Sequence, residues 1–178
     1  MTGLRTVRRS FSDPRVRRSI RRILRGTELC SVATVSPGKR AHVSAAYFAY
    51  SPDLELYFLS DPASRHCRNL ERNASMAVAV FRSDQVWGRA DRGMQLFGTC
   101  REVWGRQARL AERVYAKRFP GYVRTLRGTS PGDRRIAAQL RGYGRYRFVP
   151  RWVKILDERE FGDGVLVVAT VPRARPKR

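Results

Sequence analysis

The stretch Phe58-Leu-Ser-Asp-Pro-Ala-Ser-Arg-His-Cys-Arg-Asn-Leu70 decides the fold, and it contains the first candidate site. An apolar strand ends at Ser60, and the helix that follows has Ser64, Arg65 and His66 at its start. The Asp-Pro pair and Ser64 both suit a helix start, because such side chains cap free amide groups and proline fits the first turn. Amides, hydroxyls and a guanidinium together favour an anion, so this junction is predicted to hold a phosphate monoester. The alternative is an ordinary capped helix whose arginine is merely solvated.

Antiparallel strands are predicted on both sides of this segment. Apolar residues recur with a period of two, and turn residues separate the runs at Ser36-Pro37-Gly38-Lys39 and Ser51-Pro52-Asp53. These turns predict an antiparallel meander of the first three strands, and Pro150 predicts a break near the end of the chain. The predicted strands cover residues 29–36, 41–50, 54–60, 76–81, 93–104, 143–149, 152–157 and 164–171.

Helices and loops interrupt the strands. Asp13-Pro14 begins a helix that ends at Gly26, with apolar residues on one side and arginines on the other, and Pro120-Gly121 ends a later helix. The predicted helices cover residues 14–25, 64–73, 106–119 and 133–140, and residues 83–92 form a loop or hairpin tip. Residues 13–171 are therefore expected to form a single mainly β domain, a small barrel or sandwich with peripheral helices. A loose basic arm at residues 1–12 and a disordered basic tail at residues 172–178 flank it.

The charge of the chain favours anionic partners. The net charge is +22, from 37 Lys and Arg against 15 Asp and Glu. This excess attracts polyanions and anionic ligands, but it does not imply specific nucleic-acid recognition. No apolar run approaches the roughly 18 residues of a membrane-crossing helix, and the N-terminus lacks the pattern of a secretion signal. We expect a cytoplasmic protein with no membrane contact, which binds nucleic acid only non-specifically.

No set of residues forms a recognisable catalytic or metal-binding motif. Cys30, Cys67 and Cys100 stand singly on two predicted strands and a helix, which indicates small core residues. His42 and His66 are the only histidines, and no spacing of metal ligands occurs. If the protein is an enzyme, a bound cofactor supplies the chemistry while protein groups orient it.

The order of these elements resembles the pyridoxamine 5′-phosphate oxidase-like family of FMN-binding split barrels. The similarity covers roughly residues 14–104 and, more weakly, residues 148–157. It implies a six-stranded antiparallel Greek-key barrel that forms a homodimer, with FMN in a groove between the two subunits. The arginine- and histidine-rich C-terminal motif of the pyridoxamine oxidases proper is absent, so the resemblance points to a small bacterial member that does not oxidise that vitamin.

The same resemblance assigns phosphate-binding residues. Ser60, Ser64 and Arg65 are expected to hold the cofactor phosphate, and His66 stands where a basic residue such as lysine often occurs. This agrees with the anion preference of the junction, because two hydroxyls and a guanidinium at a helix start supply converging donors without a metal.

The flavin ring is expected to lie against a neighbouring strand. Arg40, His42 and Ser44 alternate onto one face of the strand at residues 41–50 and its preceding turn. Gln95 resembles a glutamine that reaches the flavin in related proteins. Its alternative role is that of a barrel glutamine that satisfies the backbone.

Two classes of function remain open at this point. The first is an FMN-dependent oxidoreductase that acts on a small and anionic substrate or reductant, with deazaflavin (F420) or haem as the nearest alternative cofactors. Haem needs an axial ligand, for which only the two histidines or a cysteine are available. The second is a non-catalytic module that binds flavin or nucleic acid, because arginines and aromatic residues alternate at residues 143–148 as in proteins that stack on single strands.

Overall fold

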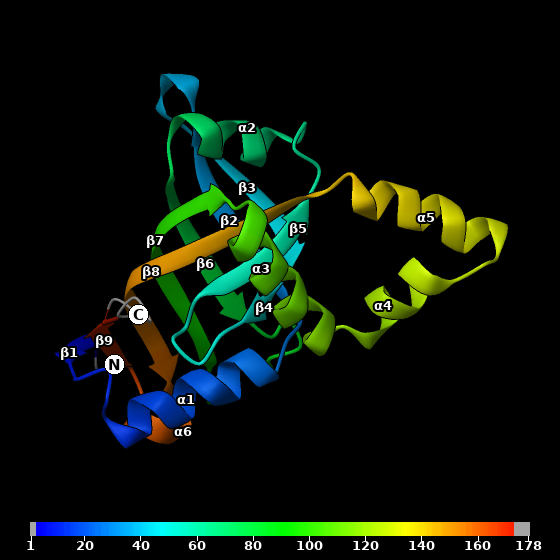
Figure 1. Cartoon of the computed structure of the whole chain (residues 1–178). Helices are drawn as coiled ribbons and strands as arrows, with labels where there is room; N and C mark the ends of the chain where they lie inside the picture. The colour runs from blue at the N-terminus through cyan, green and yellow to red at the C-terminus, as the bar shows by residue number, and fades with distance from the viewer. Residues whose placement is uncertain (1–2, 173–178) are drawn as a thin grey trace.

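Six strands form the body of the protein as a barrel that is split at one seam (Figure 1). The computed structural model describes residues 3–172. The strands follow the order β3-β2-β6-β7-β8-β5, and each hydrogen-bonded neighbour in this order is antiparallel. Their bounds are β2 (Leu29–Ser36), β3 (Arg40–Tyr47), β5 (Leu56–Ser60), β6 (Ser75–Phe81), β7 (Arg92–Glu102) and β8 (Gly144–Asp157). The mainly β, six-stranded split barrel with peripheral helices is thus confirmed, and three further strands extend its sheet.

The seam lies between β3 and β5, the two strands at the ends of this order. No hydrogen-bonded pairing joins β3 to β5 in the part of the chain that the structure describes. The helix α2 (Arg65–Arg72) follows β5 directly and packs on β2 and β3. Figure 1 places α2 at one end of the barrel, and α1 (Pro14–Arg25) and α6 (Glu158–Phe161) at the opposite end.

Alternation along the strands fills the barrel with apolar side chains. Val32, Val78, Leu96 and Val153 face one another across four neighbouring strands, and each is at most 2% exposed. The helix α1 closes the end of the barrel with its apolar side, as its sequence predicts. The bounds of α1 also match the predicted helix, because the carboxylate of Asp13 accepts from the first-turn amide of Arg15, and Gly26 terminates the helix. The three cysteines are buried in the same core.

The strand β8 is continuous, so the break predicted at Pro150 is wrong. Proline cannot donate to the ladder, and the pairing with β7 shifts register between Phe97 and Gly98, opposite Pro150. A side chain at Gly98 would place its Cβ 2.1 Å from the carbonyl oxygen of Val149, so only glycine fits there. The bulge lets one long strand pair with β5 through its first half and with β9 (Val165–Thr170) through its second half.

The predicted loose arm at residues 1–12 contains a strand. The segment β1 (Arg5–Arg8) pairs in parallel with β9, whose outer edge would otherwise be unpaired. Val7 packs against the core, which favours an ordered segment over a solvated arm. Residues 1–2 and 173–178, which include all but Pro172 of the predicted disordered tail, lie outside the described residues.

The predicted meander forms only in part. The strand expected over residues 41–50 divides at the buried Phe48 into β3 and the two-residue β4 (Ala49–Tyr50). The amide of Phe48 donates to the carbonyl oxygen of Glu28 at 3.1 Å, next to the last β2–β3 pair of Leu29 and Tyr47, and the pairing with β2 ends there. Only β4 pairs with β5 from this side, at Leu56 and Tyr57, whereas β8 pairs with the whole length of β5 along its other edge.

Helices between β7 and β8 extend away from the barrel. Pro120 ends α3 (Gly105–Arg118) as predicted, but it also begins α4 (Pro120–Arg127), where a proline suits the first turn. The next helix, α5 (Pro131–Arg141), packs on α4, and Figure 1 shows the two projecting from the barrel. The turn after β2 is the short 3-10 helix η1 (Pro37–Lys39). Within residues 3–172, no helix combines the length and the apolar character needed to cross a bilayer.

Candidate functional site

A cluster of hydroxyls and imidazoles lies at the junction of β5 and α2. His66, on the first turn of α2, is at its centre: its Nε2 is 2.7 Å from the hydroxyl of Ser60 and 3.3 Å from that of Ser64. Its Nδ1 is 3.2 Å from the hydroxyl of Ser44, which also lies 3.1 Å from Nε2 of His42. We call these five residues the serine–histidine cluster. The structure therefore brings together five of the eight residues predicted for the site.

The serine–histidine cluster spans the seam of the barrel. Ser44 belongs to β3 and Ser60 to β5, and His66 bonds to both although no backbone pairing joins these strands. The rings of His42 and His66 are nearly parallel, with centroids 6.5 Å apart. Burial, and secondarily the charge of His42, lower the pKa of His66 below its ordinary value of 6.5. His66 is therefore uncharged at neutral pH, and it is not the fixed cation that a lysine would be.

A pocket of about 680 Å³ lies beside α2, and we call it the α2 arginine pocket. None of the five cluster residues lines it, but their chain neighbours Ala41, Ala63 and Arg65 do. Four arginines line it: Arg40 at the start of β3, and Arg65, Arg68 and Arg72 along one side of α2. Within residues 3–172, none of these guanidinium groups has a carboxylate within ion-pair distance. The pocket is therefore suited to an anion that brings its own negative charge.

Only two of the four arginines were predicted from the sequence. Arg68 and Arg72 follow Arg65 by three and seven residues, the spacing that places side chains on one side of a helix. That spacing is the signal that identifies them. Asn69, which also lines the pocket, donates to the hydroxyl of Thr34 at 3.0 Å and so fixes α2 against β2.

The start of α2 differs from the prediction in its capping. Ser64 occupies the capping position, but its hydroxyl makes no capping hydrogen bond and lies toward His66 instead. The carboxylate of Asp61 accepts from the amide of Ala63 at 2.8 Å, in the turn that precedes α2. It therefore shapes that turn rather than capping the helix. The two hydroxyls predicted to bind phosphate, those of Ser60 and Ser64, thus bond to an imidazole in this structure.

Gln95 lies apart from the other predicted residues. It is exposed on the outer side of β7, opposite Ala79 and Lys154 on the neighbouring strands. It borders a row of apolar residues that crosses five strands in register, which we call the apolar sheet face. Its members are Val43, Ala33, Ala77, Phe97 and Trp152.

The apolar sheet face is open to solvent in the single chain. Val43 is 64% exposed and Trp152 is 39% exposed, although Trp152 stacks on Phe97 with ring centroids 3.9 Å apart. Exposed apolar surface that is continuous over several strands is typical of an interface. A metal site is not indicated, because no group of three or more His, Cys, Asp or Glu residues is suitably placed within the described part of the chain.

The fold and this site define a small split-barrel protein with an arginine-lined pocket beside α2. The chain belongs to the pyridoxamine 5′-phosphate oxidase family, whose model matches residues 16–141. No curated protein matches the chain.

Similar solved structures support the same fold. One is a protein of unknown function from Agrobacterium tumefaciens, with 19% identity, a TM-score of 0.65, and coverage of 82% of this chain and 57% of that chain. A haem-binding protein from Mycobacterium smegmatis has 14% identity and a TM-score of 0.66, with coverage of 86% and 57%. A FAD-binding protein from Mesorhizobium loti has 16% identity and a TM-score of 0.56, with coverage of 75% and 87%. This chain thus spans little more than half the length of the first two.

Proposed function

We propose that the protein is a flavin-dependent oxidoreductase that binds FMN with its phosphate in the α2 arginine pocket. The observation that carries the proposal is the convergence of Arg40, Arg65, Arg68 and Arg72 on one pocket without a carboxylate partner among the described residues. Several guanidinium groups and the start of a helix supply the charge and the donors that a phosphate dianion needs. When bound, the flavin supplies the redox chemistry, and the protein orients it.

The serine–histidine cluster fits the role of orienting a polar ring. Its hydroxyls can act as donors or acceptors, and neutral imidazoles offer one of each, so the cluster can exchange its internal hydrogen bonds for bonds to a ligand. Because His66 is uncharged, the positive charge at this end of the barrel comes from the arginines. That charge also favours an anionic substrate or reductant.

The proposal includes a homodimer formed through the apolar sheet face. A second copy is the occupant that this face suits, since its apolar row is continuous in register and remains open in one chain. Gln95 borders this face, so in a dimer it would be directed toward the partner rather than toward the serine–histidine cluster of its own chain.

Haem is the second candidate, because one similar structure is of a haem-binding protein. The geometry favours flavin over haem. Both ring nitrogens of His66 lie within hydrogen-bond distance of hydroxyls, Nε2 of His42 bonds to Ser44, and the three cysteines are buried. Iron bound through either ring nitrogen of His66, or through Nε2 of His42, would displace one of these contacts. A deazaflavin would use the same phosphate pocket as FMN.

The test compares FMN with riboflavin, which lacks the phosphate. In the variant Arg65→Ala/Arg68→Ala, we expect FMN affinity to fall by about 30-fold or more, because two charge-assisted contacts are lost, and riboflavin affinity to change by less than about threefold. The matched control is Arg124→Ala/Arg135→Ala, which removes the same charge from α4 and α5. Fluorescence quenching of each ligand gives the affinities.

Equal losses for FMN and riboflavin would remove these arginines from the phosphate site. The visible spectrum of the freshly purified protein separates the cofactors, because flavin, deazaflavin and haem absorb at different wavelengths. A Soret band together with failure to bind FMN would replace the flavin proposal with the haem alternative.

A further inference from the structure

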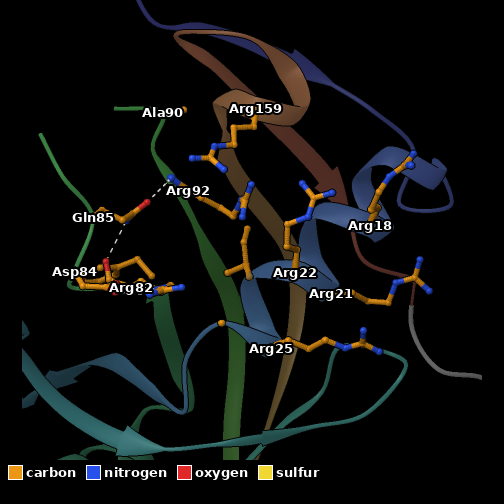
Figure 2. Close-up of a pocket in the computed structure, with 13 residues that line it drawn as sticks. Arg18, Arg21, Arg22, Arg25, Arg82, Asp84, Gln85, Ala90, Arg92 and Arg159 are labelled. Carbon is orange, nitrogen blue, oxygen red and sulfur yellow. Dashed lines mark hydrogen bonds and ion pairs between the residues drawn. The ribbon is translucent and has the colours of Figure 1, made fainter. Parts of the chain in front are cut away.

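A second arginine-rich concavity lies at the opposite end of the barrel from α2. Its volume is about 670 Å³, and we call it the arginine basin. Its arginines come from α1, from the ends of β6 and β7, and from α6 (Figure 2). They are Arg18, Arg21, Arg22, Arg25, Arg82, Arg92 and Arg159. The pyridoxamine oxidase-like site does not use this region.

Two carboxylates, those of the buried Asp157 and the partly exposed Glu160, pair with the arginines at the centre of the basin. Asp157, which is fully buried, has Oδ1 3.1 Å from Nε of Arg92 and Oδ2 3.8 Å from Nη1 of Arg22. The hydroxyl of Ser19 donates to the same carboxylate at 2.7 Å. Nη2 of Arg22 lies 3.5 Å from Oε2 of Glu160. These two guanidinium groups are therefore fixed before any ligand arrives, which lowers the entropy cost of binding.

A third guanidinium completes the centre. Figure 2 shows the side chain of Arg159, on α6, extending to the side of the basin where Arg92 and Ala90 lie. Arg159 has no carboxylate within ion-pair distance in the part of the chain that the structure describes. Seven guanidinium groups line the basin, together with one carboxylate, that of Asp84. Two further carboxylates pair with these arginines, those of Asp157 and Glu160, so the positive charge is in large excess. A bound polyanion would relieve this repulsion.

The loop between β6 and β7 forms one rim of the basin. The amide of Arg92 donates to Oε1 of Gln85 at 2.6 Å, and the side-chain amide of Gln85 donates to the carbonyl oxygen of Arg82 at 3.1 Å. Arg82 also pairs with Asp84. The same loop carries Trp87, which is 98% exposed. An exposed indole on the loop that forms this rim would suit a ligand with a phosphate chain and, at one end, a flat ring.

We propose that the arginine basin binds a chain of linked phosphates, as found in inorganic polyphosphate or in a nucleoside triphosphate. A chain of linked phosphates carries several charges along its length, so it can pair with more of these guanidinium groups than a single phosphate can, and guanidinium groups pair with phosphate oxygens through two parallel hydrogen bonds. The concave shape and the acidic residues beneath it favour a short chain over a long nucleic acid, which needs an extended positive stripe.

The test is isothermal titration calorimetry of the full chain with inorganic tripolyphosphate at 150 mM KCl. We expect one saturable site per chain that binds tripolyphosphate at least about tenfold more tightly than orthophosphate. Arg22→Ala/Arg159→Ala should weaken tripolyphosphate binding at least about tenfold. Arg124→Ala/Arg135→Ala, with the same charge change on α4 and α5, should weaken it less than about twofold. Because Arg22 also pairs with carboxylates, Arg159→Ala alone serves as a second variant, and it should weaken binding by about threefold or more.

Comparison of tripolyphosphate with ATP distinguishes the two sources of the phosphate chain. Equal affinities for tripolyphosphate and ATP would show that the site recognises the phosphate chain alone. Tighter ATP binding that is lost in Trp87→Ala assigns it to a nucleotide, and either result sustains the proposal. Non-saturable binding, equal weakening by the basin and control variants, or tighter binding of oligodeoxythymidylate than of tripolyphosphate would overturn it. FMN affinity should be unchanged in the basin variants, so this proposal and the flavin proposal succeed or fail separately.

Discussion

The α2 arginine pocket and the arginine basin differ in what surrounds their charges. The helices that line them, α2 on one side and α1 and α6 on the other, lie at opposite ends of one barrel (Figure 1). In the α2 arginine pocket, the guanidinium groups have no carboxylate partner within residues 3–172, and the other residues that line the pocket are uncharged. In the arginine basin, the buried Asp157 and the partly exposed Glu160 pair with the central arginines. The first pocket keeps its arginines available to a ligand, whereas the second also uses them to neutralise acidic side chains.

This difference shows that net charge alone does not identify a binding site. An arginine that faces a buried carboxylate contributes to the stability of the fold, and removing either partner leaves a charge without compensation. An arginine among like charges contributes no such stability, and its repulsion is relieved only by an incoming anion. Mutations at the two ends should therefore have opposite effects on folding.

The largest effect is expected at the buried acid of the basin. Asp157→Asn should lower the free energy of unfolding by about 3 kcal/mol, because Arg92 and Arg22 lose their counter-charge at a fully buried position. Urea unfolding followed by circular dichroism measures the change. The control Asp84→Asn removes a carboxylate from an exposed ion pair and should have no measurable effect. If both variants lose the same stability, the basin arginines are not anchored as described.

A smaller effect is expected from His66 and concerns pH. The pKa of His66 is lower in the folded protein than in the unfolded chain, so as the pH falls the imidazole is protonated in the unfolded state before it is protonated in the folded state. The contribution of His66 to the free energy of unfolding is therefore fully present above the unfolded pKa of about 6.5, and it is lost progressively as the pH falls from about 7 toward 5. His66→Gln keeps a donor and an acceptor but cannot titrate, so its stability should decline less over this range. Thermal unfolding at a series of pH values gives the comparison, and identical profiles for the two proteins would contradict it.

The smallest effect is expected in the α2 arginine pocket. Arg68→Gln removes like-charge repulsion from Arg65 and Arg72, so it should raise the free energy of unfolding by about 0.5 kcal/mol at low ionic strength. Adding about 0.5 M KCl should abolish the gain, because salt screens exposed charges. Chemical unfolding at the two salt concentrations measures this. A loss of stability at low salt would mean that Arg68 has a structural partner.

The sequence predicts most of the barrel because the barrel depends on local alternation. Each of the six barrel strands and the helices α1 and α2 is marked by its own apolar period and by nearby turn or capping residues. The continuity of β8, in contrast, cannot be predicted from a local pattern. Pro150 is compensated by a register shift at Gly98, about 50 residues away, and no local pattern shows that compensation. The pairing of β1 likewise depends on the free edge of β9 near the other terminus.

The candidate site also has features that the sequence predicts and features that depend on tertiary packing. Ser60, Ser64 and His66 are close in sequence, and Ser44 reaches them across the seam, so the cluster follows from the β5–α2 junction. Sequence proximity does not show that the serine hydroxyls bond to the imidazole, nor that Arg65 lies with Arg68 and Arg72 on the neighbouring side of α2. Those outcomes depend on the rotation of α2, which Asn69 fixes through Thr34 on β2.

The length of β8 determines when the barrel can close during synthesis. This one strand supplies the partners of β5, β7 and β9, and it is made only after more than three quarters of the chain, at residues 144–157. Until it emerges from the ribosome, β5 and β7 expose open edges and apolar side chains. Such late, long-range pairing slows folding and favours aggregation of the nascent chain, so truncation before β8 should yield insoluble protein even though most of the barrel sequence is present.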